Sequence, residues 1–177
     1  MAPLVSRRDF NLPNALSLLR VALLPFVLWT LWEEWNAACL LLMAVATATD
    51  WLDGHLARRL GQVSDAGKVL DPLADKICID GMVIALSLWR NFPWWATGLI
   101  VGRDLLIVAG GLAVVRSRRT VPVSNRPGKW AAGSLAATLV CYALDWQPFG
   151  TLLLGISILM VVVSGGWYAW EFIKQQR

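Results

Sequence analysis

Four aspartates stand at regular spacings within residues 50–75, in the stretch DWLDGHLARRLGQVSDAGKVLDPLAD. Asp50 and Asp53 are three residues apart, and Asp71 and Asp75 are four residues apart. At about 100° per residue, these spacings place each pair on one face of a helix. Clustered carboxylates repel one another unless cations neutralise them, and carboxylate oxygens are the usual ligands of hard divalent cations. The stretch therefore predicts a metal-binding hairpin of two helices.

Small residues accompany these aspartates in the same register. Gly54 and Ala57 share the face of the first pair, and Gly67 lies one helical turn before the second pair. Small side chains let another backbone or a ligand approach closely. Asp65 falls outside the spacing, and we expect it to be a solvated loop residue. His55 is the single histidine, and we expect it to have a structural or interfacial role.

The composition around this stretch is strongly apolar. Of the 177 residues, 57% are hydrophobic, and eleven are tryptophan, which is too apolar for a soluble domain of this size. Six helical crossings of about 20 residues each would use nearly the whole chain. We therefore predict a single domain, residues 1–177, that is an all-α integral membrane bundle of six transmembrane helices. The predicted spans are 13–33, 36–58, 68–90, 94–116, 128–146 and 149–171.

The basic residues predict the orientation of this bundle. Twelve of them fall at helix ends or loops on one side: Arg7, Arg8, Arg58, Arg59, Lys68, Arg116, Arg118, Arg119, Arg126, Lys129, Lys174 and Arg177. The other side has Arg90 alone, so the first side and both termini are predicted to be cytoplasmic. A short interfacial segment is expected from Arg7 to Asn11. Seven tryptophans are expected to form an aromatic belt at the outer boundary: Trp29, Trp32, Trp35, Trp89, Trp94, Trp95 and Trp146.

The net charge of +4 fits this membrane topology. A nucleic-acid-binding function is not predicted, because no stretch outside the spans interleaves basic and aromatic residues. Arg103 and Asp104 lie near the middle of the fourth span. Adjacent helical residues point about 100° apart, so we expect an ion pair between them to be strained and both to face a polar cavity. The basic, proline-containing segment from Arg116 to Lys129 predicts a non-helical surface loop.

The eight-position pattern Asp-x2-Asp-Gly-x2-Ala-Arg-x8-Gly-x3-Asp-x3-Asp of residues 50–75 resembles the signature of the CDP-alcohol phosphotransferases. These are integral membrane enzymes of phospholipid synthesis. The segments PNALSLLR (13–20) and DPLADK (71–76) resemble the phosphatidylglycerophosphate synthase and cardiolipin synthase branches. Members of the family move a phosphatidyl-type group from a CDP-activated donor to an alcohol and release CMP.

The resemblance implies roles for the four aspartates. Asp50, Asp53 and Asp71 would bind two Mg²⁺ or Mn²⁺ ions, with Asp75 close enough to contribute. Asp75 is also implied to be the catalytic general base that takes the proton of the acceptor hydroxyl. The site would lie at the cytoplasmic end of the second and third spans.

The resemblance also implies how the donor is held. Gly54, Ala57 and Gly67 would make room for the cytidine diphosphate of CDP-diacylglycerol, and Arg58 would bind its phosphate. The acyl chains of the donor would stay in the lipid bilayer. Family members are commonly dimers, and we expect a homodimer here.

The acceptor is predicted from the remaining basic residues. Arg103, Arg116 and Lys129 are candidate ligands for an acceptor that itself carries a phosphate, because an anionic acceptor needs cations beside the carboxylates. We favour glycerol 3-phosphate. The alternative is phosphatidylglycerol, the acceptor of cardiolipin synthases, because an aspartate such as Asp104 after the span-four arginine resembles that branch.

Two readings from other classes are also open. A small cation transporter would explain six spans with buried acids, but it would not explain why four acids crowd one hairpin in fixed register with glycine and alanine. A non-catalytic membrane scaffold would have no reason to carry complete carboxylate chemistry.

Overall fold

The structure, a computed structural model, describes residues 12–60, 67–116 and 126–175, with side chains described for 15–49, 73–108 and 130–163. Every regular element in this part of the chain is a helix, so the predicted all-α fold is confirmed. Each boundary lies within four residues of its prediction. The helices are α1 (Leu12–Trp32), α2 (Asn36–Leu60), α3 (Gly67–Trp89), α4 (Trp94–Arg116), α5 (Arg126–Ala143) and α6 (Gln147–Gln175).

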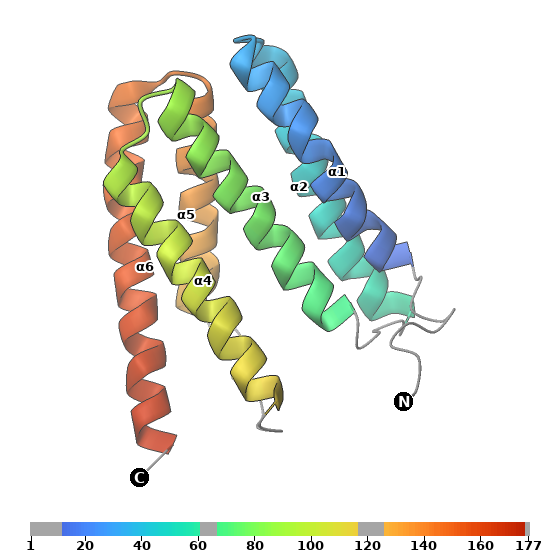
Figure 1. The fold of residues 1–177 in the computed structure, drawn as a ribbon, viewed down its shortest axis with the longest axis vertical. Coiled ribbons are helices and arrows are strands. Elements are labelled where there is room, and N and C mark those ends of the chain that lie inside the picture. The colour runs from blue at the N-terminus through green and yellow to red at the C-terminus, as the bar shows by residue number, and fades with distance from the viewer. Residues whose placement is uncertain (1–11, 61–66, 117–125, 176–177) are drawn as a thin grey trace. The chain divides into compact units, whose positions relative to one another are not determined.

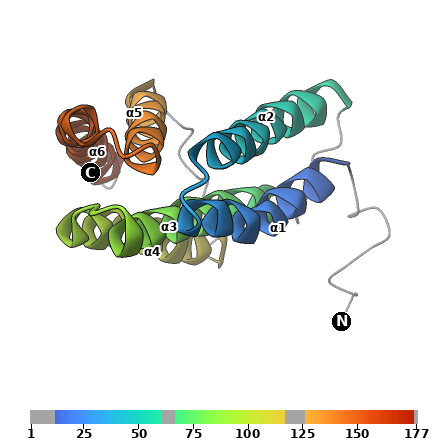
Figure 2. The ribbon, with the colours of Figure 1, turned by 90° about the horizontal axis from the view of Figure 1, so that it is seen from above.

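The chain divides into two compact units, Met1–Trp89 and Arg90–Arg177. In the first unit, α1 packs against both α2 and α3. Figure 1 shows that α1 and α2 run in opposite directions and that α3 returns in the direction of α1, so the end of α2 and the start of α3 lie at the same end of this unit. In the second unit, α5 and α6 form an antiparallel pair, which Figure 2 shows from above.

The same turn closes α1 and α5. Glu34 adopts a φ of 59°, and the Trp35 N–H donates to the Thr30 carbonyl at 2.9 Å. Asp145 also has a φ of 59°, and the Trp146 N–H donates at 2.8 Å to the carbonyl five residues earlier. This left-handed cap satisfies carbonyls that a helix end leaves without partners, and glycine usually supplies it. Both turns place a tryptophan directly after the left-handed residue.

Tryptophans gather where the turn of the first unit lies. The rings of Trp29 and Trp35 are 5.6 Å apart, and those of Trp32 and Trp89 are 5.2 Å apart in an edge-to-face arrangement. The end of α1, the turn before α2 and the end of α3 therefore meet through aromatic side chains. The edge-to-face arrangement of Trp32 and Trp89 is one that aromatic pairs prefer.

The core of the second unit is also built around an aromatic pair. Phe92 and Tyr142 are buried, with ring centroids 4.8 Å apart. Gly150 lies so close to Tyr142 that a Cβ at this position would meet the ring at 3.0 Å. Elsewhere between α5 and α6, the buried hydroxyls of Thr138 and Ser157 are 2.9 Å apart.

Much of the outer surface of these helices is apolar. Within the described part of the chain, Ala15–Trp32 is the one helical segment that is long and apolar enough to cross a membrane, and only 28% of it is buried. Asn36–Thr49, Trp130–Ala143 and Gln147–Val163 are shorter apolar helical segments. Monomeric soluble proteins rarely expose apolar surfaces of this extent.

One predicted segment needs correction. The sequence predicted a non-helical loop from Arg116 to Lys129, but α5 already begins at Arg126, so the last four residues of that segment are helical. Pro127 is then the second helical residue, where a missing N–H removes no helical hydrogen bond. Residues 117–125 and the predicted interfacial segment from Arg7 to Asn11 lie outside the described residues.

Candidate active site

The aspartate motif lies on two unbroken helices of the first unit. α2 continues through residues 50–58, and α3 runs from Gly67 through Asp75. The two helices predicted to carry the motif are therefore confirmed at the level of the backbone. Asp65 lies in the segment 61–66, outside the described residues.

Asp75 is the motif aspartate whose side chain the structure describes. It forms an ion pair with Arg20 of α1, in which Nη1 of Arg20 donates to Oδ1 of Asp75. The arginine side chain is only 7% exposed, whereas 45% of the aspartate side chain is exposed. A charge-assisted hydrogen bond of this kind is stronger than a neutral one. The structure thus brings together two charged residues that are 55 positions apart in the sequence.

A second contact joins α1 and α3 beside this ion pair. The Cys78 thiol donates to the Arg20 carbonyl at 3.8 Å, which is a weak hydrogen bond. One turn further along α3, Gly81 faces Leu24, and a Cβ at Gly81 would lie 3.0 Å from the Leu24 side chain. These contacts determine the register of α1 against α3, and therefore the position of Arg20 relative to Asp75.

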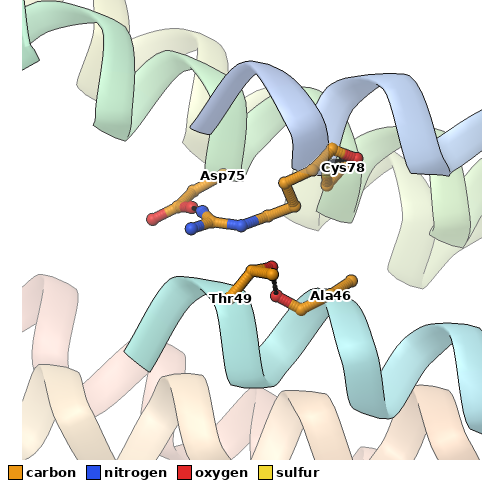
Figure 3. A network of polar contacts seen from close by, with 5 residues as sticks. Ala46, Thr49, Asp75 and Cys78 are labelled. Carbon is orange, nitrogen blue, oxygen red and sulfur yellow. Dashed lines mark hydrogen bonds and ion pairs between the residues drawn. The ribbon is translucent and has the colours of Figure 1, made fainter. Parts of the chain in front are cut away.

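Figure 3 shows the surroundings of Asp75 from close by. Asp75 and Cys78 lie on α3, and the side chain of Thr49 on α2 is directed towards the side on which α1 and α3 lie. Thr49 donates to the Ala46 carbonyl at 2.7 Å. Asp53 follows Thr49 by four residues, so it occupies the same face of α2 one turn later.

The donor set fits a divalent cation by chemistry and register. Carboxylate oxygens are the ligands that Mg²⁺ and Mn²⁺ prefer, and continuous helices keep Asp50 with Asp53 and Asp71 with Asp75 on single faces. The side chains of Asp50, Asp53 and Asp71 lie outside the described ones. Among the described side chains, no group of three or more His, Cys, Asp and Glu could hold a metal ion.

The predicted donor-binding residues also lie on these two helices. Gly54, Ala57 and Arg58 are in α2, and Gly67 is the first residue of α3. Their side chains and close contacts are outside the described ones. Their helical register with the aspartates is as predicted.

Arg103 and Asp104 correct the expectation drawn from their adjacency. They form an ion pair in which Nε and Nη2 of Arg103 approach Oδ1 of Asp104 at 2.8 and 2.7 Å. Neighbouring positions on α4 therefore do form an ion pair, in spite of the 100° between them. Asp104 is buried, whereas 32% of the Arg103 side chain is exposed. Arg116 ends α4, and Lys129 lies in the first turn of α5, both with side chains outside the described ones.

Arg20 is the site residue that the sequence did not assign a role. In the sequence it is the last position of the segment PNALSLLR (13–20). A signal was present, because Arg20 directly precedes the charge-free stretch 21–32 within an apolar helix. An ionisable residue in such a position usually faces a polar partner.

Comparison with known proteins agrees with the motif. A CDP-diacylglycerol–glycerol-3-phosphate 3-phosphatidyltransferase of Bacillus subtilis is 32% identical over 190 residues, covering 93% of this chain and 98% of the relative. A probable phosphatidylglycerophosphate synthase of Mycobacterium tuberculosis is 39% identical over 168 residues, covering 89% of this chain and 79% of the relative. A probable cardiolipin synthase (CMP-forming) of Drosophila melanogaster is 30% identical over 164 residues, covering 92% of this chain and 49% of the relative.

The match to a family model spans almost the whole chain. The family described as CDP-alcohol phosphatidyltransferase matches residues 10–167, which include all eight motif positions and parts of all six helices. The predicted resemblance is confirmed: this chain belongs to the CDP-alcohol phosphatidyltransferase family.

Proposed function

We propose that this chain is a membrane phospholipid synthase that transfers the phosphatidyl group of CDP-diacylglycerol to glycerol 3-phosphate, giving phosphatidylglycerophosphate and CMP. The observation that carries the proposal is the similarity to relatives named for this reaction, over 93% of this chain and 98% of the Bacillus subtilis relative. The family assignment favours an enzyme over the cation transporter and the scaffold.

Asp75 is proposed to be the catalytic base. The acceptor oxygen attacks the lipid-bearing phosphorus, its proton passes to the Asp75 carboxylate, and the bond from that phosphorus to the oxygen of CMP breaks. The 45% exposure of this side chain supports the role, because a base must be reached by the acceptor. Phosphoryl transfer otherwise requires mainly positioning and charge stabilisation.

Asp50, Asp53 and Asp71, with Asp75 close by, are proposed to hold two Mg²⁺ or Mn²⁺ ions. Bound ions would neutralise the diphosphate of the donor and stabilise the leaving oxygen. The carboxylate donor set and the continuous helices that carry it support this assignment. The direction of Thr49, on the face of α2 that also carries Asp53, supports it as well.

The donor nucleotide is proposed to lie along the same two helices. Gly54, Ala57 and Gly67 would leave room for the cytidine diphosphate because they lack large side chains. Arg58 would bind a phosphate of the donor, since it follows Ala57 directly and carries a planar fork of donors.

The acceptor phosphate is proposed to bind Arg103, Arg116 and Lys129. The ion pair with Asp104 supports a role for Arg103, because it orients the guanidinium while 32% of the side chain stays exposed. A guanidinium has five N–H donors, so one carboxylate oxygen does not exhaust its capacity. Both other residues lie at helix ends, where long basic side chains can reach an anion.

The bundle is proposed to cross the lipid bilayer six times as a single functional domain, with both termini and the active site on the cytoplasmic side. The apolar exposed surface of the helices supports a membrane location. The family match crosses the boundary between the two units, which supports one domain. A homodimer is proposed because Gly98 and Gly102, one turn apart on α4, have nothing within 4 Å of an added Cβ, which suits close helix packing.

A second candidate is cardiolipin synthesis, with phosphatidylglycerol as acceptor. Two observations favour it: the aspartate at position 104 and the similarity to the Drosophila melanogaster relative, although this chain covers only 49% of that protein. Both candidates share the donor, the base and the need for an anionic acceptor. Only the acceptor distinguishes them.

The deciding experiment supplies purified protein with CDP-diacylglycerol, Mg²⁺ and one acceptor at a time. CMP release with glycerol 3-phosphate, together with formation of phosphatidylglycerophosphate, supports the proposal. CMP release with phosphatidylglycerol alone assigns cardiolipin synthesis instead. Release with inositol alone contradicts the anionic-acceptor argument. Removing divalent ions with EDTA should abolish CMP release, and added Mg²⁺ or Mn²⁺ should restore it.

A further inference from the structure

We propose that Arg20 of α1 is a positioning residue of the active site, which holds the Asp75 carboxylate in the orientation needed for transfer. This inference rests on the proposed transferase function. It adds a third helix to a site that the motif places on α2 and α3 alone. The observation behind it is the ion pair between Nη1 of Arg20 and Oδ1 of Asp75.

The unequal burial of the two partners indicates which one positions the other. The Arg20 side chain is 7% exposed and the Asp75 side chain 45% exposed. The arginine is therefore held by packing, while the carboxylate keeps an accessible surface for chemistry. A planar guanidinium also restricts the direction of the carboxylate more than a point charge does.

Two independent contacts hold the backbone of α1 in register with α3 near Asp75. The Cys78 thiol donates to the Arg20 carbonyl at 3.8 Å, one turn after Asp75 on α3. Leu24, one turn after Arg20, lies against Gly81, where a Cβ would approach it to 3.0 Å. Because these two contacts, one turn apart, define the register of α1 against α3, they place the Arg20 guanidinium beside Asp75.

The charge of Arg20 also matters for the carboxylate cluster. Asp50, Asp53, Asp71 and Asp75 repel one another, and a fixed cation beside one member reduces that repulsion. Groups that hydrogen-bond to ligating carboxylates typically change activity or metal affinity by about 10- to 100-fold when removed. We expect an effect of this size from Arg20.

The competing explanation is that the ion pair only holds α1 to α3. Removing one partner of a partly buried ion pair destabilises a protein, whatever its catalytic role. The test must therefore separate turnover per folded molecule from stability. It must also separate turnover from donor binding.

The experiment compares Arg20→Lys and Arg20→Met with the control substitution Arg90→Lys. Arg90 is a second buried arginine, and it lies outside α2 and α3. The wild type is assayed first with CDP-diacylglycerol and glycerol 3-phosphate. If it releases no CMP with any acceptor, the proposed function fails. If it is active, the variants test the inference separately.

Arg20→Met should lower kcat by about 10- to 100-fold with little change in the KM for CDP-diacylglycerol. Arg20→Lys should recover part of kcat, because it keeps the charge but loses the planar fork. Arg90→Lys should lower thermal stability without lowering kcat per folded molecule. A wild-type kcat in folded Arg20→Lys and Arg20→Met would overturn the inference. Should Arg20→Met not fold, a wild-type kcat in Arg20→Lys overturns it alone.

A double-variant cycle with Asp75→Asn provides the second readout. If Arg20 acts through Asp75, adding Arg20→Lys to Asp75→Asn should not lower kcat further. Independent losses that multiply would contradict the inference. Calorimetric binding of CDP-diacylglycerol to the same variants supplies a measurement that does not depend on turnover. The dissociation constant should stay within about threefold of wild type, because the loss is expected in kcat and not in ground-state binding.

Discussion

The two units of the chain use the same turn but different polar contacts between their helices. The turns after α1 and α5 each contain a left-handed acidic residue followed by tryptophan, at Glu34 and at Asp145. Away from this turn, the first unit joins α1 and α3 through an ion pair between buried Arg20 and half-exposed Asp75. The second unit joins α5 and α6 through a hydrogen bond between the fully buried hydroxyls of Thr138 and Ser157.

The difference shows how a structural polar contact can be told from one that belongs to a site. The Thr138 hydroxyl donates to the Ser134 carbonyl at 2.9 Å, so it accepts from Ser157, and the small neutral network is closed within the helix pair. The pair of Arg20 and Asp75 combines a buried cation with an exposed anion, which leaves the carboxylate open to a ligand.

The largest effect is expected from the motif aspartates of the first unit. Asp50→Asn, Asp53→Asn and Asp71→Asn should each lower CMP release by about two orders of magnitude or more, because each removes a proposed metal ligand. Steady-state assays of purified variants check this. Asp145→Asn in the second unit is the matched control and should be nearly neutral, because asparagine tolerates the left-handed conformation. Asp65→Asn should also be close to neutral, and equal losses at Asp65 and Asp71 would contradict the site.

Asp75→Asn should separate turnover from donor binding. We expect kcat to fall by about 100- to 10,000-fold, because the proposed general base is lost. Binding of CDP-diacylglycerol should persist, because three proposed metal ligands remain. Calorimetry and rate measurements on one preparation check both quantities. A parallel loss of binding and rate would make Asp75 a ligand without a role as base.

Two glycine substitutions should act differently in the two units. Gly150→Ala places a Cβ 3.0 Å from the buried Tyr142 ring, which packs against Phe92 and cannot move easily. We expect a loss of about 1–3 kcal/mol in stability with unchanged kcat per folded molecule. Gly81→Ala meets the flexible end of Leu24 and gains helix propensity, so its stability should change by less than about 1 kcal/mol. Thermal unfolding in detergent measures both. A loss of stability larger for Gly81→Ala than for Gly150→Ala would contradict this difference between the two units.

A smaller effect than that of Gly150→Ala is expected from the hydroxyl pair of the second unit. Thr138→Val and Ser157→Ala should each lower stability by about 0.5–1.5 kcal/mol, with kcat unchanged. The double variant should lose less than the sum of the two, because both remove the same hydrogen bond. Additive losses, or a fall in kcat, would show that this contact is not a closed structural pair.

Helix positions and the core motif could be predicted because both depend on local sequence. Apolar runs, proline near a helix start and charged segments between runs determined the bounds of all the described helices to within four residues. The spacing of residues 50–75 determined which aspartates share a helical face. The predicted end of the loop before α5, at Lys129, was wrong because Pro127 is compatible with the first turn of a helix, and α5 begins at Arg126.

The sequence by itself therefore determined the helices, the register of the carboxylates and the family, since each is set by residues close together in the chain. The tertiary structure decided the contacts of Arg20 and the turns at Glu34 and Asp145. Arg20 and Asp75 are 55 positions apart, and only the parallel packing of α1 and α3 brings them together. The bond between Arg103 and Asp104 also needed three-dimensional information, because the side-chain torsions of arginine, and not the angle between adjacent Cβ atoms, decide whether the ion pair forms.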